Sequence, residues 1–386
     1  MKKIFIFLFL VPIIICCSAC WTQKQKTVQP EQPNPLIPVK SSSDDGFAVE
    51  TADVWTPTFQ LCWNELINLL GTKTVEYING NPPLADELNK QKFQKSDLNG
   101  KDYYISVSKQ TLQNKKKIEK AIKEKFNETS DILAQFNFPN IPDDRTNEWF
   151  IYSILIKNFP FSAAFDILSP EYFNDKQDSK YKYFGIISEN STNKENVREL
   201  KKHITPLFYA NDDDFALSIT DKSDSEEMIL YLTDSNKSFD EIFDEIKEKS
   251  LRKDEYTKIR TIQQKQGDDV TIVFENKYKV PYLDMDKTLA FDSELANKPI
   301  KNNNGEDFYI KKTIQTIKFK LDNTGAKLKS EAAISGLKSA MYIKKIKIYN
   351  NYYFNRPFVI FLKEKNKDKP YFAARIKDGK YLVKGE

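Results

Sequence analysis

Apolar and polar positions alternate along a stretch near the C-terminus, and this stretch predicts a half-buried strand. Within residues 308–325, FYIKKTIQTIKFKLDNTG, the alternation is regular from Thr316 onwards. The strand ends at Asp-Asn-Thr-Gly, a turn sequence whose Gly325 tolerates a positive φ. Further along the chain, residues 354–362 read FNRPFVIFL and predict a second strand.

The rest of the chain carries both helical and strand patterns. Residues 56–70 and 112–126 place apolar side chains at helical spacing, and the second of these helices is rich in lysine on its other face. Residues 149–156 form a continuous apolar run, which is typical of a strand buried on both faces. Ser238 and Glu241 form a capping-box pair at the start of another helix. The mixture predicts an α+β fold.

Composition allows a sizeable core and argues against some partners. The 386 residues are 40% hydrophobic, and Lys+Arg 59 nearly balances Asp+Glu 55, which gives a formal net charge of +4. The sequence contains no basic tract with interleaved aromatic residues, so nucleic acid is not an expected partner. We expect the folded part to be a monomer.

The N-terminus predicts export. Lys2 and Lys3 precede an apolar run over residues 4–17, which is too short for a comfortable membrane span and indicates a signal peptide over residues 1–19. Ser-Ala-Cys at its end resembles the bacterial lipobox, which would make Cys20 the site of lipidation. The alternative is ordinary secretion with cleavage near Ala19. The expected location is the outer face of the cell membrane, or the medium if the lipobox fails.

A linker is predicted to follow the signal, and a folded domain to follow the linker. Residues 20–51 are rich in Pro, Gln and Ser and predict a tether, and residues 52–386 predict one domain. In this domain Cys62 is the single cysteine, so no disulfide framework is expected. A catalytic thiol would need a histidine, and the chain has only His203. A free buried cysteine is the simpler interpretation, and one His with one Cys offers no zinc site.

The order of motifs resembles the serpins, the serine protease inhibitor superfamily. A strand ending in D-x-x-G, a segment of small residues and lysines, then F-N-R-P-F and a final strand resemble the last part of a serpin. A D-I-L run at residues 131–133 and the apolar strand at 149–156 resemble the segments before and within a central serpin strand. Ser153 stands where the family has Asn, and Gln315 where it has a latching His.

This resemblance implies a large mixed central β-sheet, smaller sheets and surrounding helices, with the N-terminal helical part reduced. It also implies that residues 326–342 form a reactive-centre loop, which a protease cuts and which then inserts into the central sheet. The implied hinge residues are Gly325, Ala326, Leu328, Ser330 and Ala332. The candidate scissile region is Lys338, Ser339, Ala340 and Met341. Small or apolar residues at alternate positions of this segment are what an insertable strand needs.

The implied function is inhibition of serine or cysteine endopeptidases, with a target protease as partner, no cofactor and no enzymatic activity. Two interpretations stay open beside it. Lys327-Leu328-Lys329 is bulkier than the family hinge and should slow insertion, which favours a non-inhibitory surface binding protein; the segment also fits an amphipathic surface helix. Residues 284–288, DMDKT, match the D-x-D-x-T loop of haloacid-dehalogenase phosphatases, a distant alternative because the motif comes late in the chain.

Overall fold

A computed structural model describes residues 37–38, 53–174, 176–187, 194–264, 271–303, 307–326 and 345–385. Its helices are α1 (Thr58–Leu70), α2 (Pro83–Asn89), α3 (Leu112–Phe126), α4 (Lys194–His203), α5 (Phe239–Leu251), α6 (Lys253–Gln264) and α7 (Asp292–Leu295). Helix α1 and the basic helix α3 are confirmed where the periodicity predicts them. Within the described ranges, no helix combines the length and the apolar character that crossing a membrane requires.

The core is built on a six-stranded antiparallel sheet in the order β2-β19-β18-β10-β9-β8. Its strands are β2 (Val54–Trp55), β8 (Ile204–Asn211), β9 (Asp214–Thr220), β10 (Glu226–Leu232), β18 (Phe358–Glu364) and β19 (Pro370–Ile376). All seven residues of β19 are buried, and only Lys363 of β18 is partly exposed. The strand predicted from FNRPFVIFL is therefore confirmed, and it lies in the middle of the sheet, buried on both faces.

A four-stranded sheet in the order β17-β11-β7-β6 packs beside this core. Its strands are β6 (Asp166–Phe173), β7 (Lys176–Ile186), β11 (Thr271–Pro281) and β17 (Lys345–Tyr353). Strands β11 and β17 pair in parallel, whereas β6, β7 and β11 pair antiparallel, so this sheet is mixed. The fold class predicted from the sequence, α+β with mixed sheets, is confirmed.

Two further groups of strands form separate ladders. One is the antiparallel pair of β3 (Tyr103–Lys109) and β4 (Trp149–Leu155). The other joins β1 (Ile37–Pro38), β12 (Leu283–Ala290) and β15 (Gln315–Leu321). Two-stranded pairs are formed by β13 (Pro299–Ile300) with β14 (Phe308–Tyr309), and by β16 (Gly325–Ala326) with β5 (Phe159–Pro160). We call β3–β4 and β12–β15 the two half-sheets.

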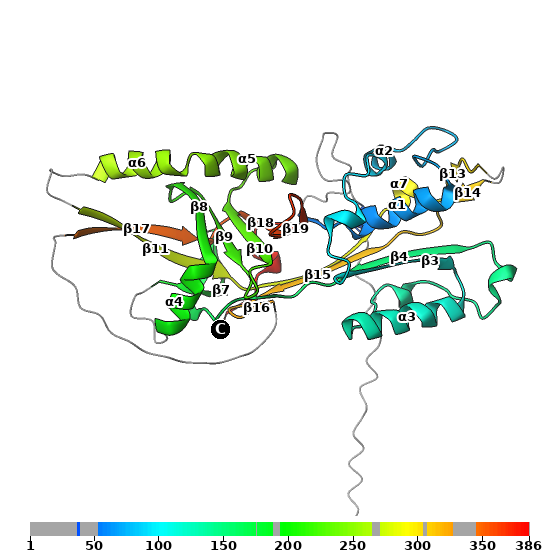
Figure 1. Ribbon diagram of the computed structural model, residues 1–386, viewed down its shortest axis with the longest axis horizontal. Coiled ribbons are helices and arrows are strands. Elements are labelled where there is room, and N and C mark those ends of the chain that lie inside the picture. The colour runs from blue at the N-terminus through cyan, green and yellow to red at the C-terminus, as the bar shows by residue number, and fades with distance from the viewer. Residues whose placement is uncertain are drawn as a thin grey trace, which may run out of the picture. The chain divides into compact units, whose positions relative to one another are not determined.

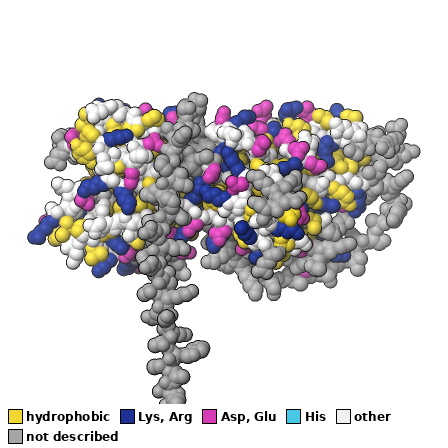
Figure 2. Space-filling model, turned by 180° about the vertical axis from the view of Figure 1, so that it is seen from behind, with side chains coloured by type: hydrophobic (Ala, Val, Ile, Leu, Met, Phe, Trp, Pro, Cys, Tyr) yellow, Lys and Arg dark blue, Asp and Glu magenta, His cyan; other side chains and the backbone are white. Residues whose placement is uncertain are grey.

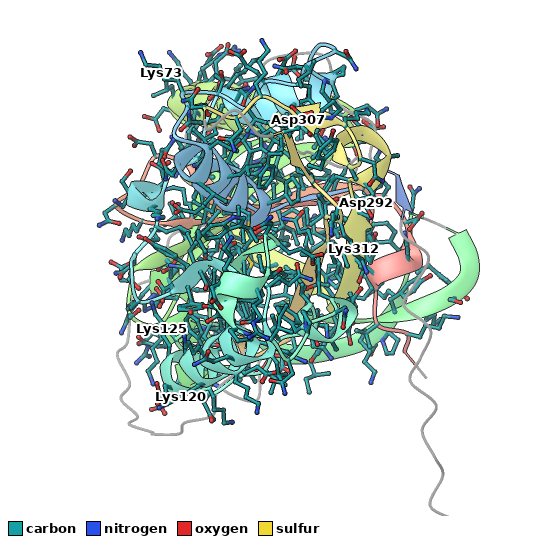
Figure 3. The ribbon with its side chains drawn as sticks, turned by 90° about the vertical axis from the view of Figure 1, so that its right-hand side faces the viewer. Lys73, Lys120, Lys125, Asp292, Asp307 and Lys312 are labelled. Carbon is teal, nitrogen blue, oxygen red and sulfur yellow. The ribbon has the colours of Figure 1, made fainter. Side chains whose placement is uncertain are left out.

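Helices α1 and α3 cover opposite faces of the β3–β4 half-sheet (Figure 1). Under α3 a small separate core contains Ile118, Ile122, Leu133, Phe150 and Tyr152. Lys120 and Lys125 of α3 lie at the lower left in Figure 3. Lys125 Nζ donates to the carbonyls of Gly100 and Tyr103. Basic and acidic side chains are interspersed on the face shown in Figure 2, which agrees with the balanced composition.

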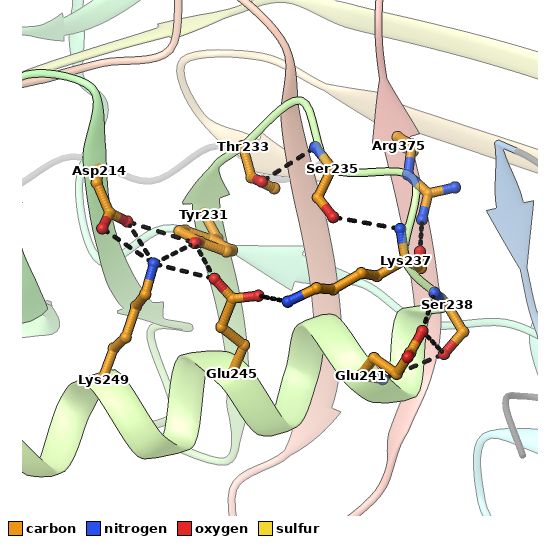
Figure 4. Close-up of polar contacts among 10 residues, drawn as sticks. All are labelled: Asp214, Tyr231, Thr233, Ser235, Lys237, Ser238, Glu241, Glu245, Lys249 and Arg375. Atoms are coloured by element: carbon orange, nitrogen blue, oxygen red, sulfur yellow. Dashed lines mark hydrogen bonds and ion pairs between the residues drawn. The ribbon is translucent and has the colours of Figure 1, made fainter.

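Polar contacts attach helix α5 to the six-stranded sheet (Figure 4). The predicted capping box is confirmed: Glu241 N donates to Ser238 Oγ, and Ser238 N donates to Glu241 Oε2. Near the other end, Lys249 Nζ lies 2.9 Å from Asp214 Oδ2 and 2.9 Å from Glu245 Oε1. The helix is thus held both by its apolar face and by the Lys249–Asp214 ion pair to the sheet.

Candidate functional site

A cavity of about 1170 Å³ lies between the two half-sheets. Strand β4 lines one side and β15 the other, and α1 contributes Phe59, Cys62 and Trp63. Within the described residues no ladder pairs β4 with β15. Strand β4 was expected to be buried on both faces, yet Trp149 is exposed and Ile151, Ile154 and Leu155 are only partly buried. This departure has a clear cause, because β4 has a neighbouring strand on one edge only.

The edge of β4 that faces the cavity has no strand paired with it in the described part of the chain. Ile156 N donates to Asp102 O and Gln110 N donates to Glu148 O at the two ends of the β3–β4 ladder, so the bonded positions of β4 are the even-numbered ones. The odd-numbered positions, Trp149 to Leu155, therefore direct their N–H and C=O groups towards the cavity. Such an edge is a template for another strand.

At one end of the gap, the chain after β15 forms a hairpin whose second strand, β16, lies between β15 and β5. Gly325 N donates to Asp322 O at 3.2 Å, and Asp322 N donates to Gly325 O at 3.4 Å. On the other side Phe161 N donates to Thr324 O at 3.1 Å, and β16 pairs antiparallel with β5. The chain thus turns back from the end of β15 and joins the continuation of β4. It follows that β15 and β4 run in the same direction, with room for one antiparallel strand between them.

Gly325 is required at this turn for two reasons. Its φ is +101°, a conformation that side-chain-bearing residues avoid. A Cβ at this position would lie 2.3 Å from Phe159 O and 2.6 Å from Phe161 N, which is too close. The glycine turn predicted from Asp-Asn-Thr-Gly is confirmed, and its physical reason includes this close approach to β5.

The N-terminal end of α1 is hydrogen-bonded to both half-sheets. Ser153 Oγ of β4 donates to Thr58 O at 2.8 Å. Gln315 Nε2 of β15 donates to Thr58 Oγ1 at 2.9 Å. Thr58 therefore connects the two edges of the gap through one residue. Ser153 and Gln315, two of the positions where the sequence departs from the serpin pattern, thus lie on facing edges and share a partner.

The other predicted site residues fall outside the described ranges. Gly325 and Ala326 form β16. The remaining positions are Leu328, Ser330, Ala332, Lys338, Ser339, Ala340, Met341 and the lipidation candidate Cys20, and all of them lie outside the described residues. The structure shows only where the segment that follows Ala326 starts, at the end of β16.

Two motifs considered for catalysis are not arranged for it. Burial raises the pKa of the Cys62 thiol to about 12, and its Sγ contacts Ile151 O, whereas the His203 ring hydrogen-bonds to Thr220. Asp284 and Asp286 are exposed within the antiparallel β12–β15 pair. Each of them lies opposite a lysine of β15. A D-x-D-x-T phosphatase instead needs its first carboxylate at the carboxyl end of a parallel strand.

A buried ionic cluster, which the sequence did not reveal, lies at the end of the gap where β16 begins. Lys157 Nζ lies 2.7 Å from Asp102 Oδ2, 2.7 Å from Glu226 Oε1 and 2.8 Å from Glu364 Oε1. Burial opposes the charge of Lys157, but bonds to the three carboxylates outweigh it and raise the pKa of the lysine. Because these residues come from distant parts of the chain, no local pattern could identify the cluster.

No protein-family model and no curated protein matches this chain. Among solved structures it is similar to tengpin, a thermophilic serpin in its native state, with a TM-score of 0.44 and 12% identity over 88% of this chain and 96% of tengpin. It is also similar to Serpin48 of the insect Tenebrio molitor, with a TM-score of 0.39 and 11% identity over 85% and 92% of the two chains. A tumour-suppressing serpin gives a TM-score of 0.39 and 10% identity over 68% and 65%.

Proposed function

We propose that this chain is a serpin-type inhibitor of serine or cysteine endopeptidases. In this proposal the protease cuts a peptide bond within residues 338–341, and the segment that follows Ala326 then inserts between β4 and β15. The observation that carries the proposal is the gap itself, which has two unpaired strand edges and an antiparallel hairpin already formed at one end. Filling the gap would satisfy these backbone groups and bury apolar surface, so insertion would be energetically favourable.

The pairing that exists fixes the register of the inserted strand. Gly325 lies opposite Pro160 and Ala326 opposite Phe159. The same register continued along β4 would pair Ser330 with Leu155 and Gly336 with Trp149, so residues 330–336 would pair with the whole of β4. The turn at Asp322 and Gly325 gives the register on the other side and would bring Ala332 opposite Gln315.

This register also determines which side chains would enter the cavity. Along β15 the odd-numbered residues from Gln315 to Leu321 are buried, and paired residues of neighbouring strands point to the same face. Ser330 and Ala332 would therefore point into the cavity, and Glu331 away from it. The small residues at the inward positions agree with the alternation in the sequence.

The chemistry of the trap uses the protease's own nucleophile. Its Ser Oγ or Cys Sγ would attack the carbonyl carbon of a peptide bond within residues 338–341. The C–N bond would break, the new amine would leave with the proton taken from the nucleophile, and the acyl-enzyme ester or thioester would remain. Insertion would carry the acylated end of the loop along the gap before water could hydrolyse that bond.

The test exposes the full chain to trypsin-like, chymotrypsin-like and elastase-like serine proteases. The expected result is a covalent complex that survives SDS, together with a higher melting temperature of the cleaved chain. Ala332→Glu would put a carboxylate into the cavity and should be cut without complex formation or gain in stability. Ala333→Glu, whose side chain would point outwards, is the matched control and should behave as the parent does. Equal behaviour of the two variants would overturn the proposed register.

The second candidate is a non-inhibitory serpin-like binding protein on the cell surface. Like charges favour it, because the register would place Lys327 opposite Lys320 and Lys329 opposite Lys318. This arrangement would slow insertion enough for the protease to leave by hydrolysis. Cleavage of the parent chain with no complex and no gain in stability would support this candidate against the inhibitor.

We also propose that the protein is exported and held at the membrane by a lipid on Cys20, with the domain carried on the linker at residues 20–51. The charged start, short apolar run and Ser-Ala-Cys of the N-terminus support this location. A protease outside the cell would then be the partner that the loop meets.

A further inference from the structure

The Lys157 cluster contains more negative than positive charge and is shielded from water. One ammonium group faces three carboxylates, those of Asp102, Glu226 and Glu364, and the side chain of Lys157 is only 8% exposed. If all four groups are ionised, two negative charges are left without a partner. Unpaired charge is costly in a buried site, which favours the uptake of a proton.

The cluster connects one half-sheet to the central core. Asp102 precedes β3, and Lys157 lies between β4 and β5. Glu226 begins β10 and Glu364 ends β18, and these two glutamates lie directly opposite each other in the ladder. Lys157 is two residues from Phe159, which pairs with Ala326, and it lines the cavity. Any change in this cluster therefore acts at the end of the gap where insertion would start.

The groups that surround Glu226 come from every element packed against it. Lys157, Glu364 and Asp102 face it, and the Tyr371 ring of β19 lies 4.8 Å from Lys157 Nζ. Asp221 accepts a hydrogen bond from the Glu226 backbone N–H. Glu226 Oε2 and the Tyr371 hydroxyl are both sealed from solvent, and the tyrosine interacts with the Glu226 carboxylate. A proton on Glu226 would remove one negative charge from this space.

Burial is the largest influence on Glu226 and raises its pKa; Lys157 and a hydrogen bond with Tyr371 oppose the rise, and the charge of Glu364 adds to it. Lys157 Nζ already occupies the centre of the three carboxylates, so the arrangement suits an ammonium group and a proton rather than a metal ion.

We propose that this cluster is a proton-dependent clamp on the gap, an inference that rests on the insertion mechanism proposed above. With Glu226 protonated, the cluster holds the end of the β3–β4 half-sheet against β10 and β18. When the proton leaves, the excess negative charge weakens this attachment, and the gap opens more readily. The sign follows from linkage: a carboxyl whose folded pKa is raised stabilises the fold below its unfolded pKa, and this contribution is lost as the pH rises through the folded value.

Hydrogen exchange of the uncleaved full chain tests the clamp. The quantity compared is the protection of amides in Tyr103–Lys109 and Trp149–Leu155, in the parent and in Glu226→Gln at the same pH, so that intrinsic exchange cancels. As the pH rises above the ordinary glutamate pKa of about 4.3, the parent should lose protection relative to Glu226→Gln, by about tenfold for each unit by which the fold raises the pKa. Glu227→Gln, next along β10 and paired with Lys363, is the matched control and should follow the parent.

Parallel pH profiles of the parent and Glu226→Gln, or a Glu227→Gln profile like that of Glu226→Gln, would overturn the clamp. If Glu226→Gln does not fold, Asp102→Asn provides the same test, because it also removes one negative charge and should flatten the profile. The inhibitor proposal fails separately, through absence of a stability gain after cleavage. If the cleaved chain does gain stability, the rate of loop insertion after cleavage should rise with pH in the parent and not in Glu226→Gln.

Discussion

At the scale of single residues, the sequence predicted those features that depend on near neighbours. Gly325 could be identified because the four consecutive residues 322–325 form a turn sequence. The structure adds the close approach of Gly325 to β5. Ser153 and Gln315 stood out as departures from the serpin pattern, although their shared partner Thr58 could not be foreseen. Lys157 carried no signal, because its three partners come from distant segments that only the fold brings together.

Gly325→Ala should lower the free energy of unfolding through both backbone strain and a clash with Phe159 O. Strain of this kind costs about 1–3 kcal/mol, and the clash should add to it. Gly80→Ala is the matched control, since Gly80 has a φ of +95° but no atom within 4 Å of the added Cβ. Urea titration of both variants measures the difference. Equal losses would show that the contact with β5 contributes nothing.

At the scale of elements, each helix or strand was predictable and its neighbours were not. The helical period of α3 and the capping box of α5 identified these helices from their own residues. The even spacing of buried residues along β15 was likewise readable. Which strands pair depends on contacts between distant segments, so the sequence did not reveal that β3–β4 and β12–β15 form separate ladders.

Glu245 should control part of the acid sensitivity of α5. Although burial opposes it, hydrogen bonds from Lys237, Lys249 and Tyr231 lower the pKa of Glu245 to about 2. A lowered carboxyl pKa stabilises the fold above the unfolded value, and this stability is lost as the pH falls towards the folded one. Glu245→Gln should therefore flatten the fall in melting temperature between about pH 4.5 and about pH 2. The exposed Glu248→Gln on the same helix should leave that fall unchanged.

The lysines after Ala326 should limit the speed of insertion. Replacing Lys327 and Lys329 together by Thr would remove two like-charge pairs with Lys320 and Lys318, each worth a few tenths to about 1 kcal/mol. A larger share of the cleaved chain should then end as protease complex. Lys344→Thr removes charge beyond the proposed paired stretch and should leave that share unchanged. Densitometry of SDS gels measures both, and an effect of Lys344→Thr as large as that of the double variant would contradict the register.

At the scale of the whole molecule, the α+β class followed from the mixture of patterns. The gap between the half-sheets could not be predicted from the sequence, because an unfilled space between strands does not change the local propensity of either strand. Strand β1 also pairs with β12 inside the stretch predicted to be a linker, since two residues suffice to extend an open edge.

Localisation is a property of the complete chain and can be tested as such. Cys20→Ser should move the protein from the membrane fraction to the soluble one, because the proposed lipid would have no attachment site. Cys62→Ser is the control and should stay with the membrane. Immunoblots of separated fractions measure this, and retention of Cys20→Ser in the membrane would argue against lipid anchoring at that residue.

The two residues of β16 that already pair with β5 have a consequence for timing. The slow event in adding a strand is the first contact, since chain entropy is lost before hydrogen bonds compensate for it. Here that contact exists before any cut is made, so the remaining residues can pair one after another from a nucleus that is already formed. The conversion should therefore begin without a lag, as a single exponential whose rate is independent of protein concentration.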